Sequence, residues 1–292
     1  MIDFSKLAEQ YKHELLEQVI PFWMNHSIDT QFGGFLHCLE RDGSVFDTDK
    51  FVWMQGREVW MLSKLYNTVH EPTVSAETRQ QWLDAAIQGA EFLKSKAHDG
   101  NLNFYFSLDR EGHPLVEPYN IFSYTFAVIA FGQLALATGN EEYADIARRT
   151  FDIVLSKVDN PKGRWNKAAS GARAMKSFAL PMILCNVALE IEHLLSPDFL
   201  QETMETCIHE VMEVFYRPEL GLIVEHLSMD NELVDCMDGR LMNPGHAIEA
   251  MWFIMDLGKR LNRPELIEKA CQIALAEAEY GWDKQHGGIF YF

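Results

Sequence analysis

The chain has 292 residues, of which 48% are hydrophobic, and a formal net charge of −18. The acidic excess is spread along the sequence and disfavours nucleic acid and anionic membranes as partners, because both bind clustered lysine and arginine. Five cysteines without a CxxC pair indicate reduced thiols in a cytoplasmic protein rather than a disulfide framework.

Helical periodicity recurs along the whole sequence. The first segment is amphipathic and lacks the pattern of a signal peptide. The uncharged run 118–140 is long enough to cross a bilayer, but polar side chains interrupt it, so we expect a buried helix instead. The predicted helices span 3–25, 51–69, 75–96, 119–138, 141–158, 173–194, 198–216, 244–261 and 264–281.

Alternate helices differ in composition. Those that begin near 51, 119, 173 and 244 are rich in aromatic residues and poor in charge, which favours an inner ring of helices inside an outer one. Short hairpins are predicted at Phe32–Asp47, Asn101–Leu115 and Gly221–Asp235, and the final segment 283–292 repeats the Gly-Gly opening of the first.

The sequence therefore predicts an all-α fold, an (α/α)6 barrel or toroid, built as a single domain over residues 1–292. The spacing of the helix pairs is about 64 residues, and a closed ring of six pairs needs twelve helices. The chain supplies about nine of the twelve helices by this reasoning, so we expect an incomplete barrel that lacks its C-terminal helices.

His246 is the first candidate for chemistry. The segment "GRLMNPGHAIEAMWFIM" begins a helix, with Asn243 as N-cap and Pro244 at the first helical position. A helix N-terminus disfavours a charged imidazolium, and Glu249 lies one turn later on the same face. The pattern predicts a neutral general base oriented by Glu249, although a core histidine satisfied by Glu249 and a backbone carbonyl fits the same residues.

Arg57 is the second candidate. It follows Trp53 by one turn in "FVWMQGREVWMLSKLYN". A buried arginine among aromatic residues needs an anion or a polar ligand, and a salt bridge to a carboxylate explains it equally well. In a functional reading Arg57 stabilises a developing oxyanion and Trp53 stacks on a sugar ring.

Other candidates carry weaker signals. Glu225 follows an apolar run and could reach a pocket, although an exposed glutamate at a strand end is the commoner case. The loop "DNPKGRWNK" is basic and contains glycine, as many solvated turns do. The histidines are dispersed, and "HAIE" is not HExxH, so a metal site is not expected.

Five segments together resemble the N-acylglucosamine 2-epimerase family, with the N-acetylglucosamine 2-epimerases of bacteria and cyanobacteria most similar. They are "FVWMQGREVWMLSKLYN", "MKSFALPMILCNVALEIEHL", "RPELGLIVEHLSMD", "GRLMNPGHAIEAMWFIMDLG" and "WDKQHGGIFYF". The resemblance implies an (α/α)6 barrel that interconverts N-acetylglucosamine and N-acetylmannosamine by moving the C2 proton through an enediolate-like intermediate.

The resemblance also implies roles for particular residues. His246 is then a catalytic base, Glu249 its orienting partner and Arg57 the group that binds the enediolate oxygen. Trp53, Lys176 and Glu225 are expected to bind substrate. Family members of this type are activated by ATP without consuming it, which makes the loop residues Lys162, Arg164 and Lys167 candidate phosphate contacts.

Two departures from the family pattern matter. Related isomerases and cellobiose 2-epimerases carry a histidine on the third inner helix, where this chain has Lys176. The difference favours the N-acetylglucosamine 2-epimerases over the isomerases. The family's second catalytic histidine belongs to the last inner helix, and none of the eleven histidines occupies that motif. We therefore expect a truncated barrel with little or no epimerisation and an exposed apolar edge.

Alternative functions remain open at this point. An aldose–ketose isomerase on the same scaffold needs only one base. A glycosidase of the toroid type needs two carboxylates, for which Glu225 and Asp235 are available. A non-catalytic binding module is a third alternative. Helical toroids of this kind often form homodimers, and the expected small-molecule partner is an amino sugar.

Overall fold

A computed structural model describes residues 3–70, 72–118, 120–158, 169 and 171–291. The contacts divide the chain into two compact units, Met1–Asn166 and Lys167–Phe292, and each unit is described by itself. Nothing in this division tests the prediction of one barrel domain over 1–292, which stays a prediction, as does the absence of C-terminal helices.

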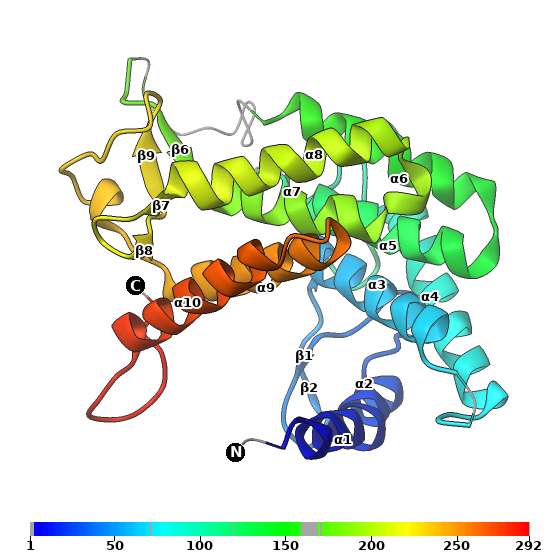
Figure 1. Cartoon of the computed structure of the whole chain (residues 1–292). Coiled ribbons are helices and arrows are strands. Elements are labelled where there is room, and N and C mark those ends of the chain that lie inside the picture. The colour runs from blue at the N-terminus through cyan, green and yellow to red at the C-terminus, as the bar shows by residue number, and fades with distance from the viewer. Residues whose placement is uncertain (1–2, 71, 119, 159–168, 170, 292) are drawn as a thin grey trace. The chain divides into compact units, whose positions relative to one another are not determined.

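The first unit is built from helices that run from α1 to α6 (Figure 1). α1 and α2 are joined without a break by a π-helical segment, Leu15–Val19. The core lies where α3 packs against α4 and α5, and α5 against α6. The bounds are α1 Phe4–Glu14, α2 Ile20–His26, α3 Val52–Thr68, α4 Ala76–Lys96, α5 Phe122–Thr138 and α6 Glu141–Ser156.

α5 is the buried centre of the first unit. Every residue from Ser123 to Ala135 is buried, as predicted for this uncharged segment. Gly139 ends the helix in the left-handed region with φ of 67°, where a side chain is disfavoured. The Asn140 side chain then caps α6 by accepting a hydrogen bond from the Glu142 N–H at 2.9 Å. Among the described residues, no helix is both long and apolar enough to cross a membrane.

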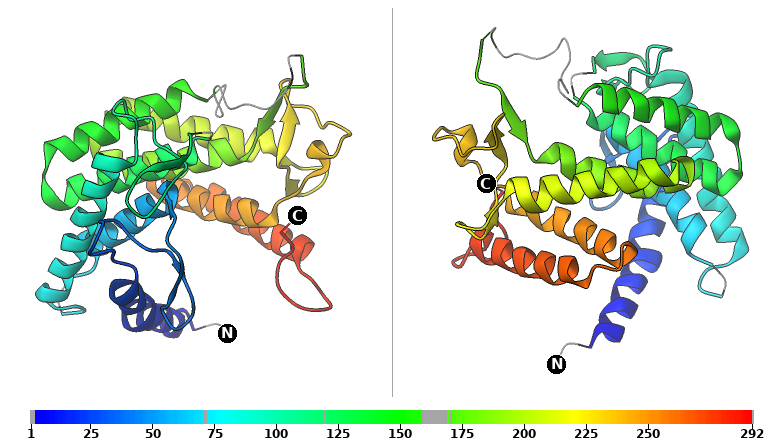
Figure 2. Two further views of the ribbon diagram at one scale, coloured as in Figure 1. Left: turned by 180° about the vertical axis from the view of Figure 1, so that it is seen from behind. Right: turned by 45° about the horizontal axis from the view of Figure 1, so that its top comes forward.

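The second unit holds α7 Ala179–Glu190, α8 Pro197–His209, α9 Pro244–Arg260 and α10 Pro264–Gly281. A π-helical segment, Glu210–Phe215, extends α8. α9 and α10 form an antiparallel pair that Figure 2 shows side by side. The core of this unit contains Phe178, Phe215, Met251, Phe253 and Ile254, each no more than 2% exposed.

The strands are short and lie between helices. β1 Cys38–Leu39 pairs with β2 Val45–Asp47, and β3 Lys50–Phe51 with β4 Ser107–Leu108, which pairs in turn with β5 Pro114–Val116. In the second unit β6 Met175–Ser177 pairs with β9 His226–Ser228, and β7 Tyr216–Arg217 with β8 Leu222–Ile223. All of these pairs are antiparallel.

Two predictions need correction here. The helix predicted over 173–194 begins only at Ala179, because residues 175–177 form strand β6. The hairpin predicted at Gly221–Asp235 is not a hairpin, because its two strands, β8 and β9, pair with β7 and β6. The other predicted helices agree with the observed ones to within about three residues, the boundary precision expected of sequence patterns.

The predicted repeat of the Gly-Gly segment is confirmed by its hydrogen bonds. In the first copy the Asp29 carboxylate accepts from the N–H groups of Gln31 and Phe32, and Asp29 N–H donates to Gly34 O at 3.0 Å. In the second copy Asp283 makes the same bonds to residues 285 and 286, and its N–H donates to Gly288 O at 2.9 Å. The isolated bridges Ile28–Phe35 and Trp282–Ile289 flank the two copies alike. We call this six-residue arrangement the Asp-Gly-Gly turn.

The two copies differ in what surrounds the aspartate. Around Asp29 lie two cations: the buried Lys50 Nζ at 3.0 Å from its carboxylate and the Arg110 Nε, also at 3.0 Å. The Lys50 Nζ further donates to Gly33 O at 2.6 Å and to Arg110 O at 2.8 Å. A buried ammonium is tolerated when its donors are satisfied in this way. The first turn is thereby fastened to strand β3 and to the β4–β5 connection.

Glu58 is a buried carboxyl on α3 that accepts a hydrogen bond from Ser27 Oγ. Burial raises the pKa of Glu58 to about 8, so the folded chain holds this proton at neutral pH whereas the unfolded chain releases it above its ordinary pKa. The stability that this proton contributes is therefore complete in acid and is lost as the pH rises through the pKa of the folded state.

Replacing Glu58 with glutamine should remove this pH dependence. Glutamine can still accept the Ser27 hydrogen bond, so we expect Glu58→Gln to be more stable than the parent at pH 8, with a difference that grows by about 1.4 kcal/mol per pH unit between roughly pH 5 and 8. Urea unfolding at a series of pH values measures it. Glu9→Gln, at an exposed position of α1, is the control and should track the parent. An unchanged pH slope in Glu58→Gln would contradict the assignment.

Candidate active site

His246 lies in the first turn of α9, as predicted. The Asn243 side chain caps the helix by accepting from the His246 N–H at 3.3 Å, and Pro244 occupies the first turn. Ala247, Ala250 and Met251 bury one face of the helix in the core of the second unit. Since this packing fixes the rotation of α9, it also fixes where the histidine projects.

Glu225 meets the His246 ring. Its carboxylate oxygens lie 3.1 and 3.2 Å from His246 Nδ1, and its side chain is only 7% exposed, against 35% for the histidine. The backbone of Glu225 is also held, because its carbonyl accepts from the Phe178 N–H at 2.9 Å. With Nδ1 carrying the proton toward Glu225, Nε2 is the ring nitrogen that remains for a substrate.

This geometry corrects one prediction and excludes one alternative. The carboxylate that holds the His246 ring belongs to Glu225 and not to Glu249, because Glu249 is exposed and acts on the ring through its charge. Glu225 is also not an exposed glutamate at a strand end, since it is buried between β8 and β9. A signal for burial was present in the apolar run Leu222–Val224 that precedes it.

The protonation of His246 also differs from the prediction. The hydrogen bond with Glu225 raises the pKa of His246, burial lowers it, and the charges of Glu225 and Glu249 raise it further, so that the balance lies above the ordinary value. A helix N-terminus alone would keep the ring neutral, but a carboxylate at hydrogen-bonding distance outweighs it. The pair is thus a histidine–carboxylate dyad whose ring accepts protons more strongly than a free imidazole.

Arg57 and Trp53 lie one turn apart on α3 in the first unit, as predicted. Arg57 is exposed and not buried, which corrects the expectation of a buried arginine. Its guanidinium carbon lies 5.1 Å from the centre of the Trp53 ring and 4.7 Å from that of Phe126 on α5. Phe126 was not anticipated from the sequence, because its contact with α3 joins helices that are distant in the chain.

The remaining predicted residues lie elsewhere or outside the described part of the chain. Lys176 sits on strand β6 opposite Leu227, not on a helix. The loop residues Lys162, Arg164 and Lys167 lie outside the described residues, so their prediction as phosphate contacts stays a prediction. Among the residues that the structure describes, no group of three or more His, Cys, Asp or Glu side chains is placed to hold a metal ion.

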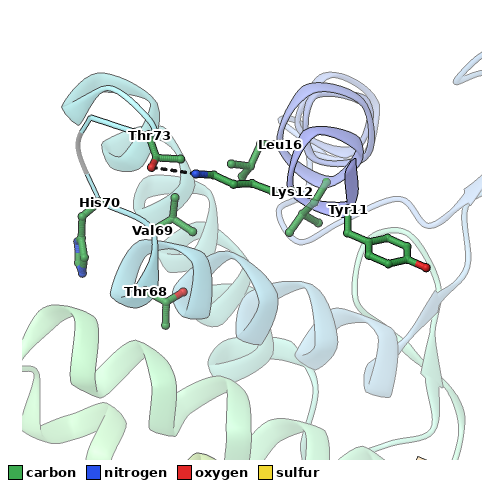
Figure 3. Close-up of a pocket in the computed structure, with 8 residues that line it drawn as sticks. Tyr11, Lys12, Leu16, Thr68, Val69, His70 and Thr73 are labelled. Carbon is green, nitrogen blue, oxygen red and sulfur yellow. Dashed lines mark hydrogen bonds between the residues drawn. The ribbon is translucent and has the colours of Figure 1, made fainter. Parts of the chain in front are cut away.

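A pocket of about 340 Å³ opens between the N-terminal helix and the end of α3 (Figure 3). Leu16 and Thr68 line it, and Lys12 Nζ donates to Thr73 Oγ1 at 3.2 Å beside it. These residues lie near the C-terminal end of α3, whereas Trp53 and Arg57 lie near its N-terminal end. The pocket is therefore separate from Trp53 and Arg57.

The chain thus has a helical fold with a histidine–carboxylate dyad at the start of α9. Residues 34–292 match the N-acylglucosamine 2-epimerase (GlcNAc 2-epimerase) family. The chain belongs to this family.

Individual relatives agree with the family match. The N-acylglucosamine 2-epimerase of Rattus norvegicus is 36% identical over 284 residues, which cover 95% of this chain and 66% of the relative. The chain thus spans slightly less than two thirds of that relative's length. The solved cellobiose 2-epimerase of Bacillus thermoamylovorans superposes with a TM-score of 0.80 at 19% identity, covering 98% of this chain and 78% of that one. A D-mannose isomerase superposes with a TM-score of 0.78 at 17% identity, covering 97% and 73%.

These similarities confirm the predicted fold class, because the cellobiose 2-epimerase is an (α/α)6 barrel. The predicted family is confirmed as well.

Proposed function

We propose that this protein interconverts N-acetylglucosamine and N-acetylmannosamine by epimerisation at C2. The observation that carries the proposal is the His246–Glu225 dyad, with Nδ1 held by the carboxylate at 3.1 Å. The relatives named N-acylglucosamine 2-epimerase, at up to 36% identity, support the choice of substrate.

The reaction suits a strong, oriented base. The C2 proton of the open-chain sugar is acidic because it lies next to the C1 aldehyde, and its removal by His246 Nε2 leaves an enolate with charge on the C1 oxygen. The proton moves to Nε2, and Glu225 stabilises the resulting imidazolium. A cation such as the Arg57 guanidinium stabilises the oxyanion.

Inversion also requires that a proton be returned on the opposite face of C2. A second acid–base group must supply it, whereas His246 alone can only lift a proton and return one to the same face. With one base the expected reaction is exchange of the C2 hydrogen with solvent, and with two it is epimerisation.

Proton NMR of N-acetylmannosamine incubated with the chain in D2O tests the proposal. Loss of the C2 proton signal with formation of N-acetylglucosamine supports a complete epimerase site, and loss without the epimer supports a site that works on one face. A folded sample that produces neither result contradicts the proposed activity for this chain.

An aldose–ketose isomerase is the second candidate, because the His246–Glu225 dyad supplies one base and moving a proton between C1 and C2 on one face needs only one. Incubation with mannose in place of the amino sugar separates the two functions. Fructose from mannose, with no change in N-acetylmannosamine, would favour the isomerase.

ATP activation belongs to the proposal as well. We expect ATP to raise the rate of C2 exchange without being hydrolysed, and the triple variant Lys162→Ala, Arg164→Ala, Lys167→Ala to lose this stimulation while keeping the rate measured without ATP. Rates with ATP, with ADP and with neither measure the effect. Stimulation that survives in the triple variant would assign the nucleotide to other residues.

We also propose a cytoplasmic location and a homodimer for this protein. All five cysteines are free, as expected of a cytoplasmic protein, and a homodimer is testable by sedimentation.

A further inference from the structure

The guanidinium of Arg57 rests against two aromatic rings. Its carbon lies 4.7 Å from the centre of Phe126 and 5.1 Å from that of Trp53, and the two ring centres are 5.8 Å apart. Three mutual contacts thus close a triangle, which we call the Arg57 clamp. Cations favour the faces of aromatic rings because of the ring quadrupole, so the two rings favour this position of the Arg57 guanidinium.

A glycine brings the two helices of the clamp together. A Cβ added to Gly56 would lie 2.8 Å from the Phe126 carbonyl oxygen and 2.9 Å from its carbonyl carbon. Because these are backbone atoms, no rotation of a side chain would relieve the contact. Gly56 therefore lets α5 approach α3 closely enough for the Phe126 ring to reach the side chain of the next residue, Arg57.

We propose that Phe126 is a positioning residue, whose ring holds the Arg57 guanidinium in the orientation that it needs to stabilise an oxyanion. The inference rests on the proposed function of Arg57 and adds a residue to it. Only a cation that is fixed before the reaction stabilises developing charge without reorganisation, and an aromatic ring against the guanidinium helps to fix it. The Trp53 ring, which lies beside that of Phe126, contacts the same guanidinium, so its face toward Arg57 is occupied and not available for stacking on a sugar.

Steady-state kinetics of C2 exchange test the proposal. Phe126→Leu keeps an apolar side chain but removes the ring, and we expect kcat to fall about tenfold with KM changed less than about twofold. Phe126→Tyr restores a ring face and should recover most of kcat. Phe131→Leu is the matched control, since Phe131 is fully buried on the same helix and packs on Tyr143. If Phe126→Leu and Phe131→Leu behave alike, Phe126 is only a core residue and the proposal is overturned.

A second measurement does not depend on catalysis. The Arg57 Nε–H signal in a proton–nitrogen correlation spectrum, assigned through Arg57→Lys, should be shifted upfield by the two rings and should return toward an ordinary position in Phe126→Leu. An unshifted signal in the parent chain overturns the clamp. If the parent shows no C2 exchange, the proposed function fails, and this spectrum still decides whether Phe126 holds Arg57.

Discussion

Replacing His246 with glutamine should lower the rate of C2 hydrogen exchange by about 10²- to 10⁴-fold, the contribution of a positioned general base. Glutamine can keep a hydrogen bond to the buried Glu225 carboxylate, which in the parent lies 3.1 Å from the ring nitrogen, but it cannot accept a proton. We therefore expect the variant to fold and to lose activity. Deuterium incorporation at C2, followed by NMR beside a thermal melt, measures both properties.

The second unit offers a matched control. His209 on α8 also pairs with a carboxylate, Glu213, at 2.9 Å, but this pair is exposed on the surface. His209→Gln should exchange the C2 hydrogen at the parental rate. A parental rate in His246→Gln would remove His246 from the mechanism and leave the dyad as a structural contact.

Replacing Glu225 with glutamine should distinguish the role of Glu225 from that of Glu249. Glu225→Gln replaces the charged acceptor on Nδ1 with an amide and leaves the imidazolium without its counter-charge, so we expect a loss of about 10²-fold, below the largest effects known for such orienting carboxylates. Glu249→Gln removes a charge that acts on the ring without a hydrogen bond, and we expect a change of less than about threefold, in line with an exposed charge.

The pH dependence gives the same pair of variants a second readout. Since the hydrogen bond with Glu225 raises the pKa of His246, the base stays protonated to a higher pH in the parent than in Glu225→Gln. The acid limb of the kcat/KM profile should therefore move to lower pH in Glu225→Gln, while its plateau falls. A larger displacement in Glu249→Gln than in Glu225→Gln would restore the orienting role to Glu249.

The sequence predicted what depends on local spacing. The helices followed from periodicity, and the positions of His246 after Asn243 and of Arg57 after Trp53 followed from single turns. The contacts that complete these groups are not local. Glu225 reaches His246 across 21 residues, and Phe126 reaches Arg57 from a different helix.

The hairpins predicted at Phe32–Asp47 and Asn101–Leu115 are confirmed, but pairing between strands that are distant in the sequence was not predicted, for the same reason. Residues 175–177 have a helical pattern in isolation and form a strand because they pair with β9, which lies about 50 residues later in the sequence. Glu249 was predicted in place of Glu225 because helical spacing identifies only neighbours on the same helix. Glu225 is the residue that contacts His246 in space.

The two Asp-Gly-Gly turns show where the shape of this motif is encoded. Both copies have the same hydrogen bonds and two glycines with positive φ, between 68° and 93°, although Lys50 and Arg110 surround Asp29 and Asp283 lies in a largely exposed segment. The six residues thus carry their own conformation. The turn conformation is encoded locally, so exchanging the hexapeptides 29–34 and 283–288 should preserve the bend at both sites. The cations around the first turn then attach it to its neighbours and do not determine its shape.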